Sequence, residues 1–122
     1  RACGLSGSKV VYLQDLAVQF EKGTLNPARW PDLSDDELIE QLTRVRGIGR
    51  WTAEMFLIFY MMRPDILPLA DLGVQKAMRL HYNHGRPLGS RKLAALNKLW
   101  QPWRSVATWY LWRSLDPIPV EY

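Results

Sequence analysis

The sequence predicts an all-α fold, and three observations carry that prediction. Apolar residues recur at helical spacing along nearly the whole chain of 122 residues, and neither strand-like alternation nor an internal repeat is visible. Hydrophobic residues make up 48% of the chain and charged residues 23%, which is enough apolar material for a buried core. We therefore expect residues 1–122 to form a single compact domain, an array of about six helices.

Start and stop signals divide the chain into these helices. Gly23 ends the first helix, and a proline-rich loop follows it. Ser34 and Glu37 have the spacing of a capping box, and the helix that they begin must end at Gly47. The six predicted helices cover residues 8–22, 34–47, 50–62, 71–82, 90–100 and 102–115.

Burial can be predicted for parts of this array. The helix over residues 50–62 carries apolar side chains on every side, so we expect it to be the buried central element. Among the tryptophans, we expect Trp100, Trp103 and Trp109 to pack in the core.

The composition excludes several classes of protein and site. The lone Cys3 excludes a disulfide framework and a cysteine-based metal site. No apolar stretch reaches the roughly 18 residues that would cross a membrane, so we expect no membrane partner. His81 and His84 have no third ligand nearby in the sequence, and we expect both to be surface residues and not metal ligands.

The whole chain has a formal net charge of +4, and basic residues gather in its second half. No acidic residue lies between Asp71 and Asp116. The eight basic residues in that stretch are Lys76, Arg79, Arg86, Arg91, Lys92, Lys98, Arg104 and Arg113. They predict a positive surface, which is either a phosphate-binding face or an ordinary solvated face of helices, and charge alone leaves both open.

The run LTRVRGIGRWTAEMF, residues 42–56, predicts a tight hairpin between two helices. Gly47 and Gly49 permit positive φ and a close backbone approach, and the next helix presents free N–H groups beside them. A phosphate would bind there, and Ile48 between the glycines would hold the hairpin against the core. A plain helical turn with a glycine cap is the alternative from spacing alone.

With the segments that follow it, this run resembles the helix-hairpin-helix of the DNA glycosylase superfamily. The shared features are a glycine pair, an alcohol and an alanine at the head of the next helix, and a proline-containing loop that carries an aspartate. In this sequence they are Gly47 and Gly49, Thr52 and Ala53, Pro64 and Pro68, and Asp71. The segments GIGRWTAEMF, RPDILPLADLG and WQPWRSVATWYLW are similar to the 3-methyladenine DNA glycosylase II branch.

The resemblance implies a DNA repair enzyme that removes alkylated purines such as 3-methyladenine from double-stranded DNA. It makes Asp71 the catalytic carboxylate, which would stabilise positive charge on the sugar and orient or deprotonate water. From the residues alone, Asp71 is a helix N-cap. The resemblance also assigns the base pocket to Trp51, Trp112 and Met55, and backbone contacts with DNA to Gly47, Ile48, Gly49 and Thr52.

Some positions qualify what the resemblance implies. Trp51 stands where bifunctional relatives carry a lysine nucleophile, so we expect hydrolysis to an abasic site without strand cleavage. Met55 and Gly73 stand where the bacterial inducible form has an aromatic and a larger apolar residue, which predicts a roomier pocket. No cofactor is expected, apart from a structural monovalent cation that the resemblance places on the backbone carbonyls of Thr43, Val45 and Gly47.

The chain begins at Arg1 without the upstream region that the resemblance implies, so we expect it to be the C-terminal part of a longer or split protein. The alternatives are a non-catalytic helix-hairpin-helix DNA-binding module or an inactive fragment, and a helical protein-interaction domain. A pure binding module has no need of Asp71, because a carboxylate repels phosphate. We expect the protein in the cytoplasm at the nucleoid if it is prokaryotic, and in the nucleus if it is eukaryotic.

Overall fold

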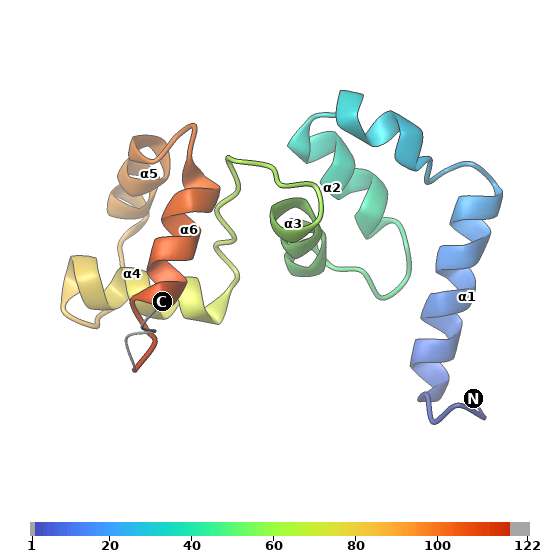
Figure 1. Ribbon diagram of the computed structural model, residues 1–122. Coiled ribbons are helices and arrows are strands. Elements are labelled where there is room, and N and C mark those ends of the chain that lie inside the picture. The colour runs from blue at the N-terminus through green and yellow to red at the C-terminus, as the bar shows by residue number, and fades with distance from the viewer. Residues whose placement is uncertain (1, 118–122) are drawn as a thin grey trace. The chain divides into compact units, whose positions relative to one another are not determined.

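The computed structural model describes residues 2–117, and every regular element in that range is a helix (Figure 1). The all-α prediction is therefore confirmed. The elements are α1 (Gly7–Glu21), the 3₁₀ helix η1 (Pro27–Asp32), α2 (Asp35–Thr43), α3 (Arg50–Phe59), α4 (Leu72–Asn83), α5 (Ser90–Leu99) and α6 (Arg104–Arg113).

None of the described helices is both long enough and apolar enough to cross a membrane.

The chain divides into two compact units, Arg1–Phe56 and Leu57–Tyr122, and the division falls inside α3. The first contains α1, η1, α2 and most of α3, and the second contains α4, α5 and α6. The expectation of a single domain over the whole chain stays a prediction. Each unit has its own buried side chains, as the following paragraphs describe.

Local signals explain how α2 starts and stops. The Ser34 hydroxyl accepts a hydrogen bond from the Glu37 N–H (3.2 Å), and the Glu37 carboxylate accepts one from the Ser34 N–H (2.8 Å), which confirms the capping box. The helix ends at Thr43 and not at Gly47. After Thr43 the Val45 N–H donates to the Leu42 carbonyl at 3.2 Å, which closes a turn at the helix end. Residues 44–49 then reverse the direction of the chain before α3.

The proline-rich segment after α1 is a 3₁₀ helix and not the predicted loop. The Asn26 side chain caps it by accepting the Ala28 N–H at 3.2 Å, and proline suits its first turn because that turn leaves N–H groups unused. Within it, Trp30 is buried and packs edge-on against Phe56, with ring centroids 5.3 Å apart. η1 therefore supplies a core side chain to the first unit. The other buried apolar side chains of that unit are Leu25, Leu38, Ile39, Leu42, Val45 and Ala53.

The helix predicted over 50–62 is only partly the buried central element we expected. Ala53 and Leu57 are fully buried, whereas Trp51 is 48% exposed and Phe59 52% exposed. The helix also ends earlier, at Phe59. Three residues after its end, Met62 takes a left-handed conformation at φ 55°, and the Arg63 N–H reaches back to the Leu57 carbonyl at 2.9 Å.

The second unit has an apolar core, to which α4, α5, α6 and the loop before α4 all contribute. Its buried members are Leu67, Val74, Ala77, Met78, Leu96 and Leu111. Trp100 packs partly buried against this cluster, as expected. Trp103 and Trp109 do not, since they are 61% and 53% exposed. Trp109 lies in α6 as predicted, but on a face that points away from this core, whereas Trp103 is the N-cap residue that precedes α6 and is not part of the helix in which the sequence placed it.

A bidentate ion pair fixes the start of α6 to the loop after α3. Arg104 Nε and Nη2 donate to the two carboxylate oxygens of Asp65 at 2.7 Å and 3.0 Å, and Arg104 Nη1 donates to the Asn97 side chain at 2.8 Å. The hydrogen bonds from the Arg104 guanidinium hold the pKa of Asp65 below its ordinary value. Arg104 therefore contributes less to the predicted basic surface than its sequence neighbourhood suggests.

We predict that Asp65→Asn lowers the free energy of unfolding at pH 7 by about 1.5 to 3 kcal/mol, because it breaks a charged, largely shielded hydrogen-bonded pair. A depressed folded-state pKa stabilises above the unfolded value of about 3.9, and this stabilisation is lost as pH falls through the folded pKa. Urea titrations from pH 7 down to pH 2 should therefore show the difference between the two proteins shrinking.

The matched control for this experiment is Asp116→Asn, which removes the partner of Arg113 in an exposed pair. It should change the free energy of unfolding by less than about 1 kcal/mol. Equal effects of the two substitutions would contradict the role assigned to Asp65.

Candidate active site and DNA-binding hairpin

The hairpin between α2 and α3 has the geometry that its two glycines predict. Gly47 has φ 86°, a left-handed conformation that favours glycine, and the Ile48 N–H closes the turn on the Val45 carbonyl at 3.1 Å. Ile48 is half-buried and lines an apolar hollow of the first unit together with Leu16 and Leu42. Ile48 therefore packs toward the core of the first unit, as the sequence predicts.

The first turn of α3 follows directly from this hairpin. The Gly49 carbonyl accepts the Ala53 N–H at 3.1 Å, which starts the helix at Arg50. The earliest N–H groups of a helix have no partner within it and attract anions. Trp51 and Thr52 are exposed on this turn, and Met55, one turn later, is half-buried.

The carbonyls that the resemblance assigns to a monovalent cation lie in the same turn. The Val45 carbonyl accepts the Ile48 N–H, and a carbonyl oxygen has a second lone pair. Thr43 is the last residue of α2, and its hydroxyl donates to the Ile39 carbonyl at 2.8 Å. The three groups that the resemblance assigns are carbonyl oxygens, the ligand type that hard cations take.

Asp71 is the N-cap of α4, as its position in the sequence predicts. Its Oδ1 accepts the Val74 N–H at 2.8 Å, and its own N–H donates to the Pro68 carbonyl at 3.0 Å. The same Oδ1 accepts a hydrogen bond from the indole N–H of Trp112 at 2.9 Å. The carboxylate is half-buried, and two donors from different directions fix its orientation.

Trp112 is held on its edge by Asp71 and on one face by Phe59. The Phe59 and Trp112 rings are stacked, with centroids 5.8 Å apart and an interplanar angle of 3°. Trp109 packs edge-on against both rings, at 5.5 Å from Phe59 and 5.8 Å from Trp112. Trp112 therefore lies in an aromatic cluster whose geometry sets where its indole N–H points.

The sequence did not identify Phe59 and Trp109 as neighbours of Trp112. A signal was present, because Phe59 follows Met55 at i,i+4 on α3 and Trp109 precedes Trp112 by three positions on α6. Helical spacing alone could have extended the aromatic set by one residue on each helix. What it could not supply is the stacking of Phe59 on Trp112, which joins residues far apart in the sequence.

Gly73 makes the contact between Asp71 and Trp112 fit. A Cβ atom at this position would lie 3.1 Å from Asp71 Oδ1 and 3.2 Å from Trp112 Cδ1, closer than ordinary van der Waals contact. The absence of a side chain thus lets the indole lie against the first turn of α4. The sequence predicts a roomier pocket at Gly73. In the structure, the indole of Trp112 occupies the space beside the Gly73 Cα, so the missing side chain makes room for the indole.

The predicted basic surface is reduced by two ion pairs. Arg104 is bound to Asp65, and Arg113 donates to Asp116 at 3.1 Å. Lys92 donates to the carbonyl of Tyr82. The exposed basic residues of α4 and α5 still include Lys76, Arg79, Arg91 and Lys98.

The two histidines have ordinary structural contacts. His81 Nε2 lies 2.8 Å from the Ser114 hydroxyl, and His84 ends α4 in a left-handed conformation at φ 53°. Over residues 2–117, no group of three or more His, Cys, Asp or Glu side chains is placed to hold a metal ion.

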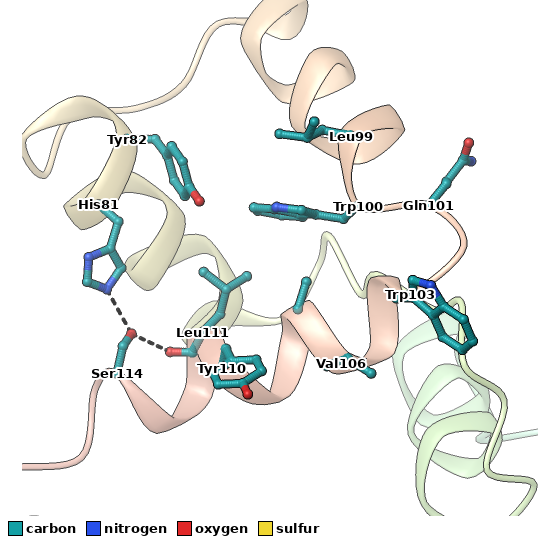
Figure 2. A pocket seen from close by; sticks show the side chains of 11 residues that line it. His81, Tyr82, Leu99, Trp100, Gln101, Trp103, Val106, Tyr110, Leu111 and Ser114 are labelled. Carbon is teal, nitrogen blue, oxygen red and sulfur yellow. Dashed lines mark hydrogen bonds between the residues drawn. The ribbon is translucent and has the colours of Figure 1, made fainter.

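A cavity of about 520 Å³ in the second unit is lined by neither Asp71 nor Trp112. Figure 2 shows its wall, to which Tyr82, Trp100, Trp103 and Tyr110 contribute aromatic side chains. The lining holds no carboxylate and no basic side chain other than His81, which is bonded to Ser114. This cavity therefore lacks the carboxylate that the resemblance implies, and it does not include Asp71.

The chain is similar in sequence and in structure to DNA-3-methyladenine glycosylases. It is 39% identical over 117 residues to DNA-3-methyladenine glycosylase 1 of Schizosaccharomyces pombe, covering 93% of this chain and 50% of the relative. The crystal structure of a DNA-3-methyladenine glycosidase from Bacillus halodurans matches with a TM-score of 0.89 at 34% identity, covering 96% of this chain and 54% of that one.

A 3-methyladenine DNA glycosylase of Schizosaccharomyces pombe, solved in complex with abasic DNA, matches with a TM-score of 0.80 at 34% identity. The match covers 98% of this chain and 60% of that one. The chain therefore spans about half the length of the relatives it matches. No protein-family model matches it.

We predict that Gly73→Ala fails to stabilise the protein, although the same change at a compatible helical position typically stabilises by about 0.4 to 1 kcal/mol. The reason is the short contact of an added methyl with Asp71 and Trp112. Gly7→Ala is the matched control, because Gly7 lies in the first turn of α1 with no atom near its missing Cβ. Urea unfolding should rank Gly7→Ala above Gly73→Ala; the reverse order would contradict the packing role of Gly73.

Proposed function

This chain belongs to the DNA-3-methyladenine glycosylase family, and from that premise we propose that it excises alkylated purines from double-stranded DNA by hydrolysing the N-glycosidic bond. The observation that supports this most directly is the carboxylate of Asp71, oriented by the first turn of α4 and by the indole N–H of Trp112. Its assignment to the type II branch of the family is part of the proposal.

Asp71 supplies the charge that the reaction needs. As the C1′–N bond breaks, its electron pair leaves with the base and positive charge develops on the sugar, which an oriented carboxylate stabilises. Water then adds to C1′ and gives up a proton, which Asp71 can accept. The products are a free base and an abasic site. The donors at Oδ1 keep the carboxylate in one orientation, so it does not have to reorganise during the reaction.

The base pocket is assigned to Trp51, Met55 and Trp112. A base alkylated on a ring nitrogen carries positive charge, and indole faces attract it by stacking and a cation–π contribution of about 0.5 to 2 kcal/mol. Phe59 stacks on Trp112 and the indole also packs against the core of the second unit, so the base would stack on the part of the indole that these neighbours leave exposed. Positive charge also makes the base a better leaving group, and weaker pairing lowers the free energy needed to flip it out.

The hairpin is assigned to the DNA backbone. The turn of Gly47, Ile48 and Gly49 lets a phosphate approach the first N–H groups of α3, where the helix dipole favours an anion. Thr52, exposed on the same turn of α3, adds a hydroxyl donor. A monovalent cation on the carbonyls of Thr43, Val45 and Gly47 would add positive charge beside that phosphate.

The proposal extends to the part of the fold outside this chain. Because the relatives are about twice as long, we infer that an upstream segment completes the structure that bends DNA and flips the base. Base release is therefore measured both with the 122-residue chain and with the full-length protein that contains it. The site of action is the nucleoid in a prokaryote or the nucleus in a eukaryote.

Asp71→Asn separates catalysis from binding. The asparagine oxygen can still accept the Val74 and Trp112 donors, so the fold should survive, but the negative charge is lost. We expect release of 3-methyladenine from methylated DNA to fall at least about 100-fold, the scale of losing one preorganised electrostatic group. Affinity for duplex DNA should be unchanged or tighter. Undiminished release would assign the chemistry elsewhere and favour a binding module.

The reaction should be purely hydrolytic, because no lysine lies beside the hairpin to form a Schiff base with the sugar. We expect methylated duplex DNA to be cut at the product site only after alkaline treatment. Borohydride added during turnover should trap no covalent protein–DNA adduct. A trapped adduct, or cutting without alkali, would contradict the monofunctional assignment.

A further inference from the structure

We propose that Tyr12 and Asp15 of α1 are positioning residues for the DNA-binding hairpin, which hold the turn of residues 45–47 in the shape that receives a phosphate. The inference rests on the proposed function of the hairpin and adds residues from a helix 31 positions away along the chain. Two independent contacts carry it, one to a backbone N–H and one to the glycine with positive φ.

The first contact is a hydrogen bond from the Arg46 N–H to Asp15 Oδ2, at 2.7 Å. The other carboxylate oxygen, Oδ1, accepts the side-chain amide of Gln19 at 3.3 Å, which fixes the carboxylate on α1. The hydrogen bond from the Arg46 N–H, together with that from Gln19, holds the pKa of Asp15 below its ordinary value. Asp15 is therefore an ionised acceptor at neutral pH.

This bond sets the direction of a carbonyl as well as of an N–H. A trans peptide is planar, so the Arg46 N–H and the Val45 C=O of the same amide point in opposite directions. With the N–H directed at Asp15, the carbonyl is directed at Ile48, whose N–H it accepts at 3.1 Å to close the turn. Asp15 thus holds one side of the amide whose other side shapes the hairpin.

The second contact is between the Tyr12 ring and Gly47. A Cβ atom built on Gly47 would lie 2.4 Å from the Cγ and Cδ2 atoms of Tyr12, so the ring lies directly over the glycine backbone. Gly47 has φ 86°, and the ring takes the space that a side chain would fill. Gly47 is required here both for its backbone conformation and for the room it gives Tyr12.

The two contacts act on consecutive residues of the hairpin from one face of α1. Tyr12 and Asp15 are three positions apart on that helix, so their side chains are neighbours. Asp15 would not bind DNA directly, because a carboxylate near the phosphate site repels the DNA backbone. The bond to Asp15 occupies the Arg46 N–H and the turn itself occupies the Ile48 N–H, so the phosphate would be received by the N–H groups that follow Ile48.

The test compares Asp15→Asn with Asp15→Ala, because both remove the charge but only asparagine keeps an acceptor oxygen. Affinity is measured by fluorescence anisotropy with a labelled 20-base-pair duplex carrying a tetrahydrofuran abasic analogue, over a salt series. We expect Asp15→Ala to weaken binding about three- to tenfold, the scale of one hydrogen bond, and Asp15→Asn to bind at least as tightly as the wild type. Equal affinities for the two variants, or equal losses, would overturn the role of Asp15.

Tyr12 is tested in the same way. Tyr12→Phe keeps the ring over Gly47 and should bind DNA as the wild type does, whereas Tyr12→Ala should bind several-fold more weakly. Tyr12→Ala binding with wild-type affinity would overturn the role of the ring. Glu21→Ala, which removes an exposed charge from the end of α1, controls for net charge and should not weaken binding.

Two further measurements keep the outcomes distinct. Circular dichroism and the urea midpoint show whether a variant is unfolded. If an alanine variant is unfolded, the proposal is tested with Asp15→Asn and Tyr12→Phe instead. A loss of DNA affinity in either of these folded variants contradicts the proposal. If the wild-type chain shows no salt-dependent binding to the duplex, the proposed function of the hairpin fails. If the wild type binds and the alanine variants match it, the positioning role alone fails.

Discussion

The proposed chemistry depends on the two hydrogen bonds that converge on Oδ1 of Asp71. One donor, the Val74 N–H, belongs to the first turn of α4, and the other, the Trp112 indole, comes from α6. A carboxylate with one donor can rotate, whereas two donors from separate helices fix its plane. The packing of α4 against α6 through Met78 and Leu111 is therefore part of the site, since it sets the distance between the two donors.

The hairpin depends on a different constraint, the reversal of the chain within six residues between α2 and α3. Such a turn exposes its amides, and Gly47 takes the positive φ that a larger residue would resist. A turn held only by its own hydrogen bonds would be mobile at the place where we propose that phosphate binds. Ile48 anchors it toward the interior, and Tyr12 and Asp15 hold it from α1, so the exposed segment is supported on both sides.

The sequence predicted what short-range chemistry determines. The capping box at Ser34 and the N-cap at Asp71 were identified because a side chain and its backbone partner lie within three residues of each other. The sequence did not show that Arg104 would bind Asp65, or that Trp109 would be exposed beside Trp112, because these contacts join segments far apart in the chain or depend on which helix face meets the core. The hairpin was identified by its glycines, but its contacts with α1 have no local signal.

Two carboxylates in a protein proposed to bind DNA need a physical reason, because each repels phosphate. Asp71 and Asp15 share one feature, a short hydrogen bond from a backbone N–H, whose partial positive charge offsets part of the carboxylate's field. They differ in what the charge does. In the proposed reaction a positive sugar develops beside Asp71, so the charge itself is useful. At Asp15 nothing positive develops, and only the direction of the acceptor matters. We thus propose that the same local chemistry serves bond cleavage in one unit and backbone geometry in the other.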